Sequence, residues 1–291
     1  MAFMKAHLLP LLMNIIFGGT FLTTYTIAVK LNHVRALFPY ISDTGNKPPE
    51  STIFSQFLNI GCIFAFLTMY AKYLYLNTCY LRDPSLSNYV LVQCLNRISI
   101  WIAPFMCLGA SMAANFQPSS AIIPHLFGAF MSGGGGITYF ALQTYISYKA
   151  CPVLNTMRMA HFRLVLTVLA ASLGSTTVLS GAVSLFMFTR SLKYVPVWGP
   201  DDGGYGYHLL STVTEWALAF VFGIYYSTFS SELRNVVIKY PTAEPRNLYI
   251  SIQHNSCFDN AIQPVDAEIQ EENRNEAFDT GREIPTSVYP E

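Results

Sequence analysis

The stretch from Leu8 to Val29 constrains the fold of this chain more than any other. It contains 22 residues without a formal charge and lies between Lys5 and Lys30. A helix rises about 1.5 Å per residue, so this stretch reaches roughly 33 Å and crosses a hydrocarbon core of about 30 Å. Its apolar part is longer than that of a signal peptide, and no small-x-small cleavage site ends it. We therefore expect a retained first membrane span.

Five further apolar stretches follow, so the sequence predicts an all-α fold, a six-transmembrane helical bundle over residues 1–239. The expected spans are about 8–29, 53–74, 92–114, 121–148, 162–189 and 207–229. Hydrophobic residues make up 52% of the 291 and charged residues 12%, whereas a soluble domain carries about 25% charge. The net charge of zero is uninformative about nucleic acid, but no basic patch is large enough to argue for it, so we expect the lipid bilayer and no nucleic acid as a partner.

Lysine and arginine near the span ends predict the orientation, because cytosolic loops carry an excess of both. Nine such residues fall on the side of the two termini: Lys5, Lys72, Arg82, Arg97, Lys149, Arg158, Arg163, Arg234 and Lys239. Five fall on the other side: Lys30, Arg35, Lys47, Arg190 and Lys193. Both termini are therefore expected in the cytosol. None of the six cysteines lies in an outer segment, so no disulfide framework is expected there.

Residues 240–291 differ in composition from the spans, with five prolines and an acidic run around residues 268–279. This segment has too little apolar surface for its burial to offset the conformational entropy lost on ordering. We therefore expect a disordered cytosolic tail. Within it, Tyr249 and Ile252 fit the Tyr-x-x-apolar pattern of endosomal and lysosomal sorting signals. A cytosolic sorting adaptor would bind such an extended segment.

Small residues indicate where the spans approach one another, since helices in lipid associate through close packing. Gly109 and Ala113 lie four residues apart in the third span, and the fourth carries Gly128, Ala129 and the run 133–136. Tight packing between neighbouring helices is one interpretation. A hinge at the four consecutive glycines is the alternative, because each glycine weakens a helix by nearly 1 kcal/mol relative to alanine.

The sixth span has one polar face, formed by His208, Ser211, Thr212 and Glu215 at helical spacing. An ionisable group at this depth is costly in lipid and normally faces the bundle or water. His125 enters the fourth span from the same side and is the expected partner of Glu215. One reading is a buried carboxyl that fixes the helix register, and the alternative is a pH-sensing or ion-relay role.

The sequence contains few motifs that are typical of enzymes. The Asp-Thr-Gly tripeptides at 43–45 and 279–281 match an aspartic protease signature, but we expect them on opposite sides of the membrane, so two carboxylates could not share one proton. No C-x-x-C pair, phosphate loop or nucleophile elbow is present. We therefore predict a non-enzyme with no cofactor or metal. Cys79 and Cys151, near cytosolic helix ends, are interpreted as buried thiols, with S-palmitoylation as the alternative.

Several motifs in order across roughly residues 8–232 resemble those of the damage-regulated autophagy modulator (DRAM) family. They are PYISDTGNKPPES at 39–51 followed by IFSQFLN, TCY at 78–80, ANFQ at 114–117, ISYKACP at 146–152, EW at 215–216 and TF at 228–229. The resemblance implies a multi-pass protein of lysosomal or endolysosomal membranes that promotes autophagy and, in some members, apoptosis, through protein partners or lipids. It implies no catalytic residues.

Two other functions stay open at this point. One is a transporter or channel that uses the polar face of the sixth span. The other is a plasma-membrane regulator of lipid asymmetry or phosphoinositide signalling, which the wider family of six-span proteins suggests.

The outer-loop motif combines residues with turn and capping chemistry. They are Pro39, Ser42, Asp43, Gly45, Pro48, Pro49, Glu50 and Ser51. The prolines restrict the backbone, Gly45 permits a turn with positive φ, and Ser42 and Asp43 can cap the turn through bonds to backbone amides. A glutamate such as Glu50 is favourable at a helix N-terminus. We expect either a structured lid on the outer face or a binding surface for a partner or lipid.

Overall fold

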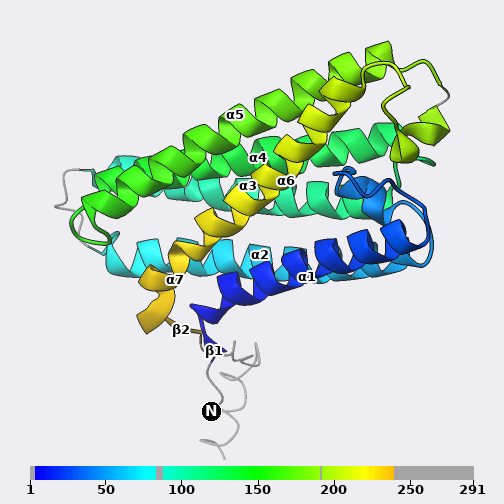
Figure 1. The fold of residues 1–291 in the computed structure, drawn as a ribbon. Helices are drawn as coiled ribbons and strands as arrows, with labels where there is room; N and C mark the ends of the chain where they lie inside the picture. The colour runs from blue at the N-terminus through cyan, green and yellow to red at the C-terminus, as the bar shows by residue number, and fades with distance from the viewer. Residues whose placement is uncertain (1–3, 83–87, 191, 239–291) are drawn as a thin grey trace, which may run out of the picture. The chain divides into compact units, whose positions relative to one another are not determined.

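The computed structural model describes residues 4–82, 88–190 and 192–238, and six long helices account for most of them (Figure 1). Their bounds are α1 Leu8–Lys30, α2 Glu50–Cys79, α3 Tyr89–Asn115, α4 Ile122–Lys149, α5 Met157–Met187 and α6 Tyr205–Ser227. The shorter elements are α7 Phe229–Glu232 and the 3₁₀-helices η1 Ser42–Gly45, η2 Leu192–Val197 and η3 Leu233–Asn235. The strands β1 Met4–Lys5 and β2 Val237–Ile238 form one antiparallel pair.

Five of these helices are long and apolar enough to cross a membrane, which confirms the predicted all-α membrane bundle. They are α1, α2, α3, α5 and the helix that continues from α6 through α7. The remaining helix, α4, has 28 residues but carries glycine at 133–136 together with serine and threonine, which contribute little hydropathy. It runs without interruption along α3, and its role as the predicted fourth span, 121–148, stays a prediction.

The outward-facing side chains show that lipid rather than water suits this surface. Large apolar side chains stand exposed on several helices, with Phe186 91%, Ile123 79%, Phe130 71% and Phe220 71% accessible. Soluble monomers rarely expose contiguous apolar patches of this kind. In a bilayer the same side chains face hydrocarbon.

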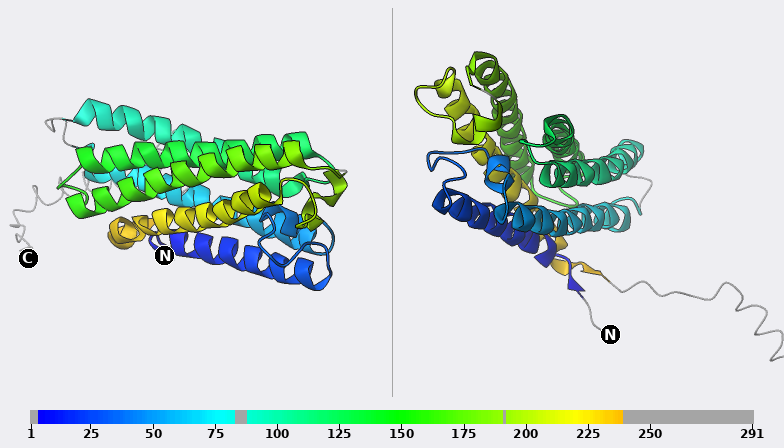
Figure 2. Two further views of the ribbon diagram at one scale, coloured as in Figure 1. Left: turned by 45° about the horizontal axis from the view of Figure 1, so that its top comes forward. Right: turned by 90° about the vertical axis from the view of Figure 1, so that its right-hand side faces the viewer.

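Helices that follow one another in the chain pack against each other, from α1 on α2 to α5 on α6, and α1 also contacts α6 (Figure 2). The β1–β2 pair joins the segment before α1 to the segment after α7, with the Ala6 amide donating to the Val236 carbonyl at 3.1 Å. We call this the basal end of the bundle, and the opposite end, where η1 lies, the loop end. Residues 240–291, with the predicted tail, lie outside the described residues.

Two helices extend further than the sequence suggested. The fifth span was predicted to begin at Phe162, but α5 begins at Met157 because the Thr156 side chain caps it and accepts a bond from the Met159 amide at 3.3 Å. The second span was expected to end near Leu74, and α2 continues to Cys79.

The closest helix contact brings α3 and α4 together at the glycines that the sequence singled out. A Cβ placed on Gly128 would lie 2.7 Å from the Gly109 carbonyl oxygen and 2.8 Å from the Ala113 amide nitrogen. The backbones therefore touch at a distance that only glycine allows. Gly133 is different, because a Cβ there would meet nothing within 4 Å.

The same substitution at these two glycines should have opposite effects. Gly128→Ala is expected to lower the free energy of unfolding by about 1–3 kcal/mol, because α3 and α4 must move apart. Gly133→Ala should be neutral or raise it by up to about 1 kcal/mol through helix propensity. Unfolding of the purified protein in detergent measures both, and equal effects would contradict the close contact.

Candidate functional site

The outer loop, residues 31–49, folds back onto the bundle instead of extending from it. Its 3₁₀-helix η1 packs against α1, α2 and α3. Asp43 and Thr44 are buried there, with 3% and 0% of their surface exposed. The Thr44 hydroxyl lies 2.9 Å from the Thr24 hydroxyl of α1 and donates to the Ile41 carbonyl at 2.7 Å. The loop is therefore built into the protein as a structured segment.

Two adjacent residues of α6 hold this loop, and we call them the loop clamp. The backbone N–H of Ile41 donates to a carboxylate oxygen of Glu215 at 2.7 Å. The indole N–H of Trp216 donates to the Pro39 carbonyl at 2.8 Å. Both bonds join residues that lie more than 170 positions apart in the chain. The ionisable group that the sequence placed inside the sixth span thus satisfies a backbone amide of the loop.

Two other residues of the predicted polar face, Ser211 and His208, also contact the loop, whereas Thr212 donates to the Leu209 carbonyl of its own helix. The Tyr40 hydroxyl donates to Ser211 at 2.8 Å, and Ser211 donates to the Thr177 carbonyl of α5 at 2.7 Å. His208 stacks on Trp198 with ring centroids 4.4 Å apart and meets the Tyr40 ring edge-on at 5.1 Å. The sequence offered no sign that aromatic rings surround this histidine.

The expected pairing of His125 with Glu215 is wrong. The Nδ1 atom of His125 lies 3.0 Å from the Ala113 carbonyl oxygen and 2.9 Å from that of Phe116. His125 therefore bonds free carbonyls at the end of α3, which a helix terminus leaves without intrahelical partners.

The expected capping by Ser42 and Asp43 is also absent from the described residues. No side-chain bond caps η1, and the Asp43 Oδ2 atom is buried without a hydrogen-bond partner. Gly45 does not adopt positive φ either. It is needed because its α-carbon lies directly against the ring of Phe54, where any side chain would collide.

The end of the motif leads into α2. Pro48 and Pro49 lie directly before this helix, and Ser51 donates its amide to the Lys47 carbonyl at 2.8 Å. Glu50 is fully buried in the first turn and pairs with His33 at the other end of the loop. The role of His33 could not be predicted, because nothing in the sequence shows that the two ends of the loop meet.

Burial changes the acid–base behaviour of the loop. Removal from water raises the pKa of the Asp43 carboxyl to about 7. Burial likewise raises the pKa of the Tyr40 hydroxyl to about 12, and the nearby carboxyls of Glu215 and Asp43 act in the same direction. A neutral carboxyl at Asp43 therefore fits the docked loop better than a carboxylate does.

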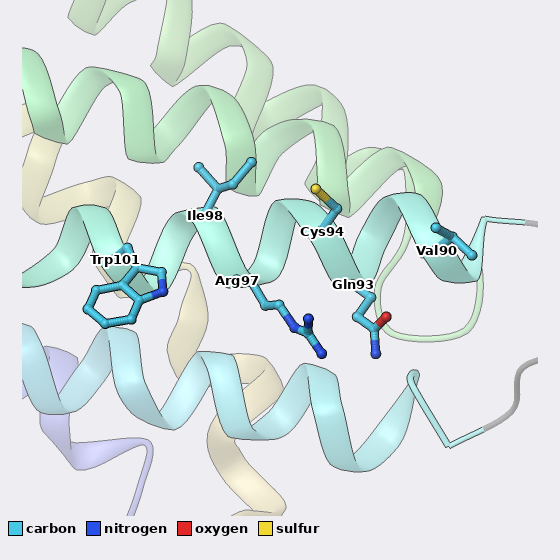
Figure 3. A pocket seen from close by; sticks show the side chains of 6 residues that line it. All are labelled: Val90, Gln93, Cys94, Arg97, Ile98 and Trp101. Atoms are coloured by element: carbon cyan, nitrogen blue, oxygen red, sulfur yellow. The ribbon is translucent and has the colours of Figure 1, made fainter.

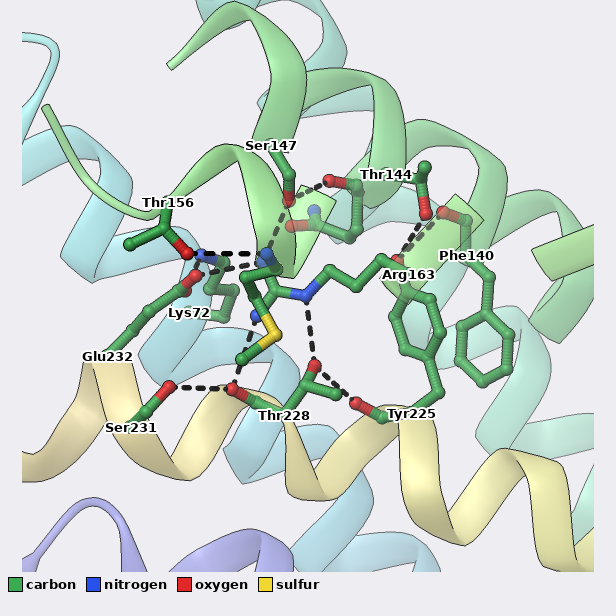
Figure 4. A network of polar contacts seen from close by, with 12 residues as sticks. Lys72, Phe140, Thr144, Ser147, Thr156, Arg163, Tyr225, Thr228, Ser231 and Glu232 are labelled. Atoms are coloured by element: carbon green, nitrogen blue, oxygen red, sulfur yellow. Dashed lines mark hydrogen bonds and ion pairs between the residues drawn. The ribbon is translucent and has the colours of Figure 1, made fainter. Parts of the chain in front are cut away.

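A second polar site at the basal end, which we call the basal cluster, consists of Lys72 of α2, Arg163 of α5 and Glu232 of α7 (Figure 4). One carboxylate oxygen of Glu232 accepts from Arg163 at 2.8 Å, and the other accepts from Lys72. At most 4% of any of these side chains is exposed. In the sequence the two cations predicted only the orientation, and their shared partner Glu232 was not expected.

Three other donors of Arg163 bond to neutral groups. Its guanidinium donates to the Thr228 hydroxyl at 2.9 Å, the Ser147 hydroxyl at 2.7 Å and the Thr228 carbonyl at 3.3 Å. Beyond it, the hydroxyls of Thr144 and Tyr225 lie 2.9 Å apart. This network ties α4, α5, α6 and α7 together, as buried charges require.

Aromatic rings lie between the loop clamp and the basal cluster. Phe140 of α4 stacks on Tyr225 with centroids 3.8 Å apart and lies 4.7 Å from the Phe222 ring. From Trp216 to Ile224, α6 carries apolar residues and a single glycine. Among the described residues the two polar sites are therefore separated by a packed apolar layer.

The other predicted sites are only partly described. Cys79 is exposed at the end of α2, so the buried-thiol interpretation is wrong there, and Cys151 is half-buried; neither forms a disulfide. Tyr249 and Ile252, the predicted sorting signal, lie outside the described residues.

Residues 5–236 match the family model described as the Frag1/DRAM/Sfk1/Cwh43P N-terminal domain. The chain belongs to the Frag1/DRAM/Sfk1/Cwh43P family. Curated relatives place it near the DRAM members, as the sequence motifs predicted. It is 35% identical over 237 residues to DNA damage-regulated autophagy modulator protein 1 of Xenopus laevis, covering 81% of this chain and 94% of the relative.

Two further relatives extend this comparison. The human protein of the same name is 32% identical over 229 residues, which is 77% of this chain and 90% of the relative. DNA damage-regulated autophagy modulator protein 2 of Mus musculus is 31% identical over 222 residues, which is 76% of this chain and 81% of the relative. No solved structure matches the chain. The residues that match the family model, 5–236, include both the loop clamp and the basal cluster.

Acid should stabilise the docked loop of this family member. The pKa of Asp43 is raised from 3.8 to about 7 on burial, so the folded state binds an extra proton between these values. Its stability relative to an Asp43→Asn variant should fall by roughly 1.4 kcal/mol for each pH unit from about 4 to about 7, and then level off. Unfolding of both proteins from pH 4 to pH 8 measures this difference. Parallel curves would contradict it.

Glu232→Gln should strongly destabilise the protein, because two buried cations lose their counter-charge. We expect a loss of about 3–5 kcal/mol in the free energy of unfolding. The matched control is Asp202→Asn, which weakens the pair between Asp202 and Arg190 at 3.3 Å, where the Arg190 side chain is 42% exposed. Asparagine keeps an oxygen that can accept the Gly199 amide bond, so this change should cost less than about 1 kcal/mol. Chemical unfolding in detergent compares the two, and similar losses would show that the basal cluster is not buried.

Proposed function

We propose that this protein is a non-enzymatic, multi-pass protein of lysosomal or endolysosomal membranes that modulates autophagy through protein partners or lipids. The observation that carries this proposal is the match to relatives named autophagy modulators, which covers 81% and 76% of this chain in two of them. A role in apoptosis belongs to the same proposal. The positive-inside pattern supports an orientation with both termini in the cytosol and the loop end in the lumen.

The docked outer loop is the proposed contact surface on the lumenal side. The loop clamp fixes its backbone, while Leu37 and Phe38 remain 58% and 47% exposed at its tip. The Tyr25 hydroxyl of α1 donates to the Ala36 carbonyl at 2.7 Å, next to this tip. A rigid backbone that presents two apolar side chains favours binding, because little conformational entropy is lost on contact.

The packed apolar layer argues against the transporter alternative. A transporter would need a polar path between Glu215 and the basal cluster, whereas the rings of Phe140, Phe222 and Tyr225 fill that region. In our proposal Glu215 acts by holding the loop, and the protein does not use its charge for ion transport.

Variants of Glu215 test this role directly. Glu215→Ala removes the acceptor of the Ile41 amide and should abolish most of the rescue of autophagic flux in cells lacking the protein. Glu215→Gln keeps an amide oxygen that can accept the same bond, so it should retain at least half of the rescue. Flux is measured as lysosome-dependent turnover of an autophagosome marker, with each variant's abundance and lysosomal location recorded in parallel.

Other outcomes would contradict the proposal in distinct ways. Equal loss in Glu215→Gln and Glu215→Ala, with normal abundance, would favour an ionisation role over a clamp. Residence of the untagged and tagged chains only at the plasma membrane would favour the regulator of lipid asymmetry or phosphoinositide signalling instead.

A further inference from the structure

One face of α3 near the basal end carries an arginine on the outside of the bundle. Val90, Gln93, Cys94, Arg97, Ile98 and Trp101 line a shallow pocket of about 350 Å³ (Figure 3). Their spacing of three or four residues places them on one side of the helix. The face is open, because Ile98 is 44% and Trp101 is 75% exposed.

Arg97 lies at a depth where an isolated charge is costly. It follows the first residue of α3, Tyr89, by eight positions, which is about 12 Å along the helix axis. The helix itself is apolar enough to span a membrane, and charged side chains in such segments normally pair with an anion or reach toward the interface. Figure 3 shows the Arg97 side chain leaning toward Gln93, and therefore toward the basal end.

No carboxylate in the described part of the chain is available to Arg97. Of the described acidic residues, all but one lie at the loop end: Asp43, Glu50, Asp201, Asp202 and Glu215. The exception is Glu232, and both of its oxygens are bonded within the basal cluster. The counter-ion of Arg97 must therefore come from outside the described residues.

We propose that this face of α3 binds an anionic phospholipid. Its phosphate bonds to the guanidinium of Arg97 and the amide of Gln93, and an acyl chain lies along Ile98 and Trp101. The order of these residues matches the order of groups in a lipid, because the polar side chains lie nearer the basal end and the apolar ones lie deeper. Guanidinium groups bind phosphate through paired N–H donors.

Two features favour this occupant over a protein partner or free phosphate. The exposed aromatic and aliphatic surface next to Arg97 faces hydrocarbon, which soluble phosphate does not enter. Cations also predominate at the basal end, which attracts anionic lipids to that leaflet. The inference depends on the membrane bundle alone and does not require the proposed role in autophagy.

Native mass spectrometry of the full-length protein, with added phosphatidylserine or phosphatidylcholine, tests the proposal. The wild-type protein should retain phosphatidylserine in preference to phosphatidylcholine. Arg97→Gln should weaken this binding at least tenfold, and Arg97→Lys should weaken it less because the charge remains. The matched control is Arg158→Gln, which removes an exposed arginine from the first turn of α5 at the same end and should change binding less than twofold.

A second measurement needs no variant. Phosphatidylserine with a photoreactive group in its acyl chain should label the wild-type peptide that contains Ile98 and Trp101. Unchanged binding in Arg97→Gln, an equal loss in Arg158→Gln or labelling only of other spans would each overturn the proposal. So would displacement of the lipid by inorganic phosphate, or an Arg97-dependent dimer that holds no lipid.

Discussion

The solvent around the long helices is hydrocarbon, and this constraint explains how the two polar sites of the bundle are built. In lipid an amide or a charged group cannot form hydrogen bonds with water, so it is stabilised by a partner inside the protein or at the membrane–water interface. The Ile41 amide finds Glu215, and the two cations of the basal cluster share one carboxylate. Arg97 has no such partner in the described residues, and its side chain is exposed.

The two polar sites have different consequences for function. The basal cluster and the neutral groups bonded to Arg163 join α2, α4, α5, α6 and α7 at the end of the bundle where β1 and β2 pair. It fixes how the helices are arranged. The loop clamp fixes a surface instead, because it holds a loop whose apolar tip remains exposed. In our account, the first site stabilises the bundle and the second presents the segment that acts on partners.

Much of the fold could be predicted from the sequence because its signals are local. Uncharged stretches such as Leu8–Val29 specify helices by length alone, and Gly109 and Gly128 mark the close approach of α3 and α4. The inward face of α6 could be predicted for the same reason, since the spacing of its polar residues is a local pattern. The family motif at 39–51 marked the outer loop as a distinctive segment, and the structure shows that this face of α6 holds it.

The partners within each site could not be predicted, because they depend on long-range geometry. His125 and Glu215 enter the bundle from the same end, yet they bond to carbonyls of α3 and to the loop, respectively. Lys72 and Arg163 resembled ordinary charges near span ends, since a sequence gives the depth of a residue but not the direction of its side chain. Glu232 could have indicated this cluster, because a buried carboxylate at the end of an apolar helix needs a cationic partner.

The central claim is that the bundle crosses the membrane with the docked loop on one side and the basal end, where β1 and β2 pair, on the other. Single cysteines at Lys47 in the loop and at Arg234 after α7, both exposed, can be compared with the unsubstituted chain in sealed lysosomes. A membrane-impermeant maleimide should add label to Arg234→Cys at once, and to Lys47→Cys only after the membrane is permeabilised. Labelling of both positions from the same side would contradict the account.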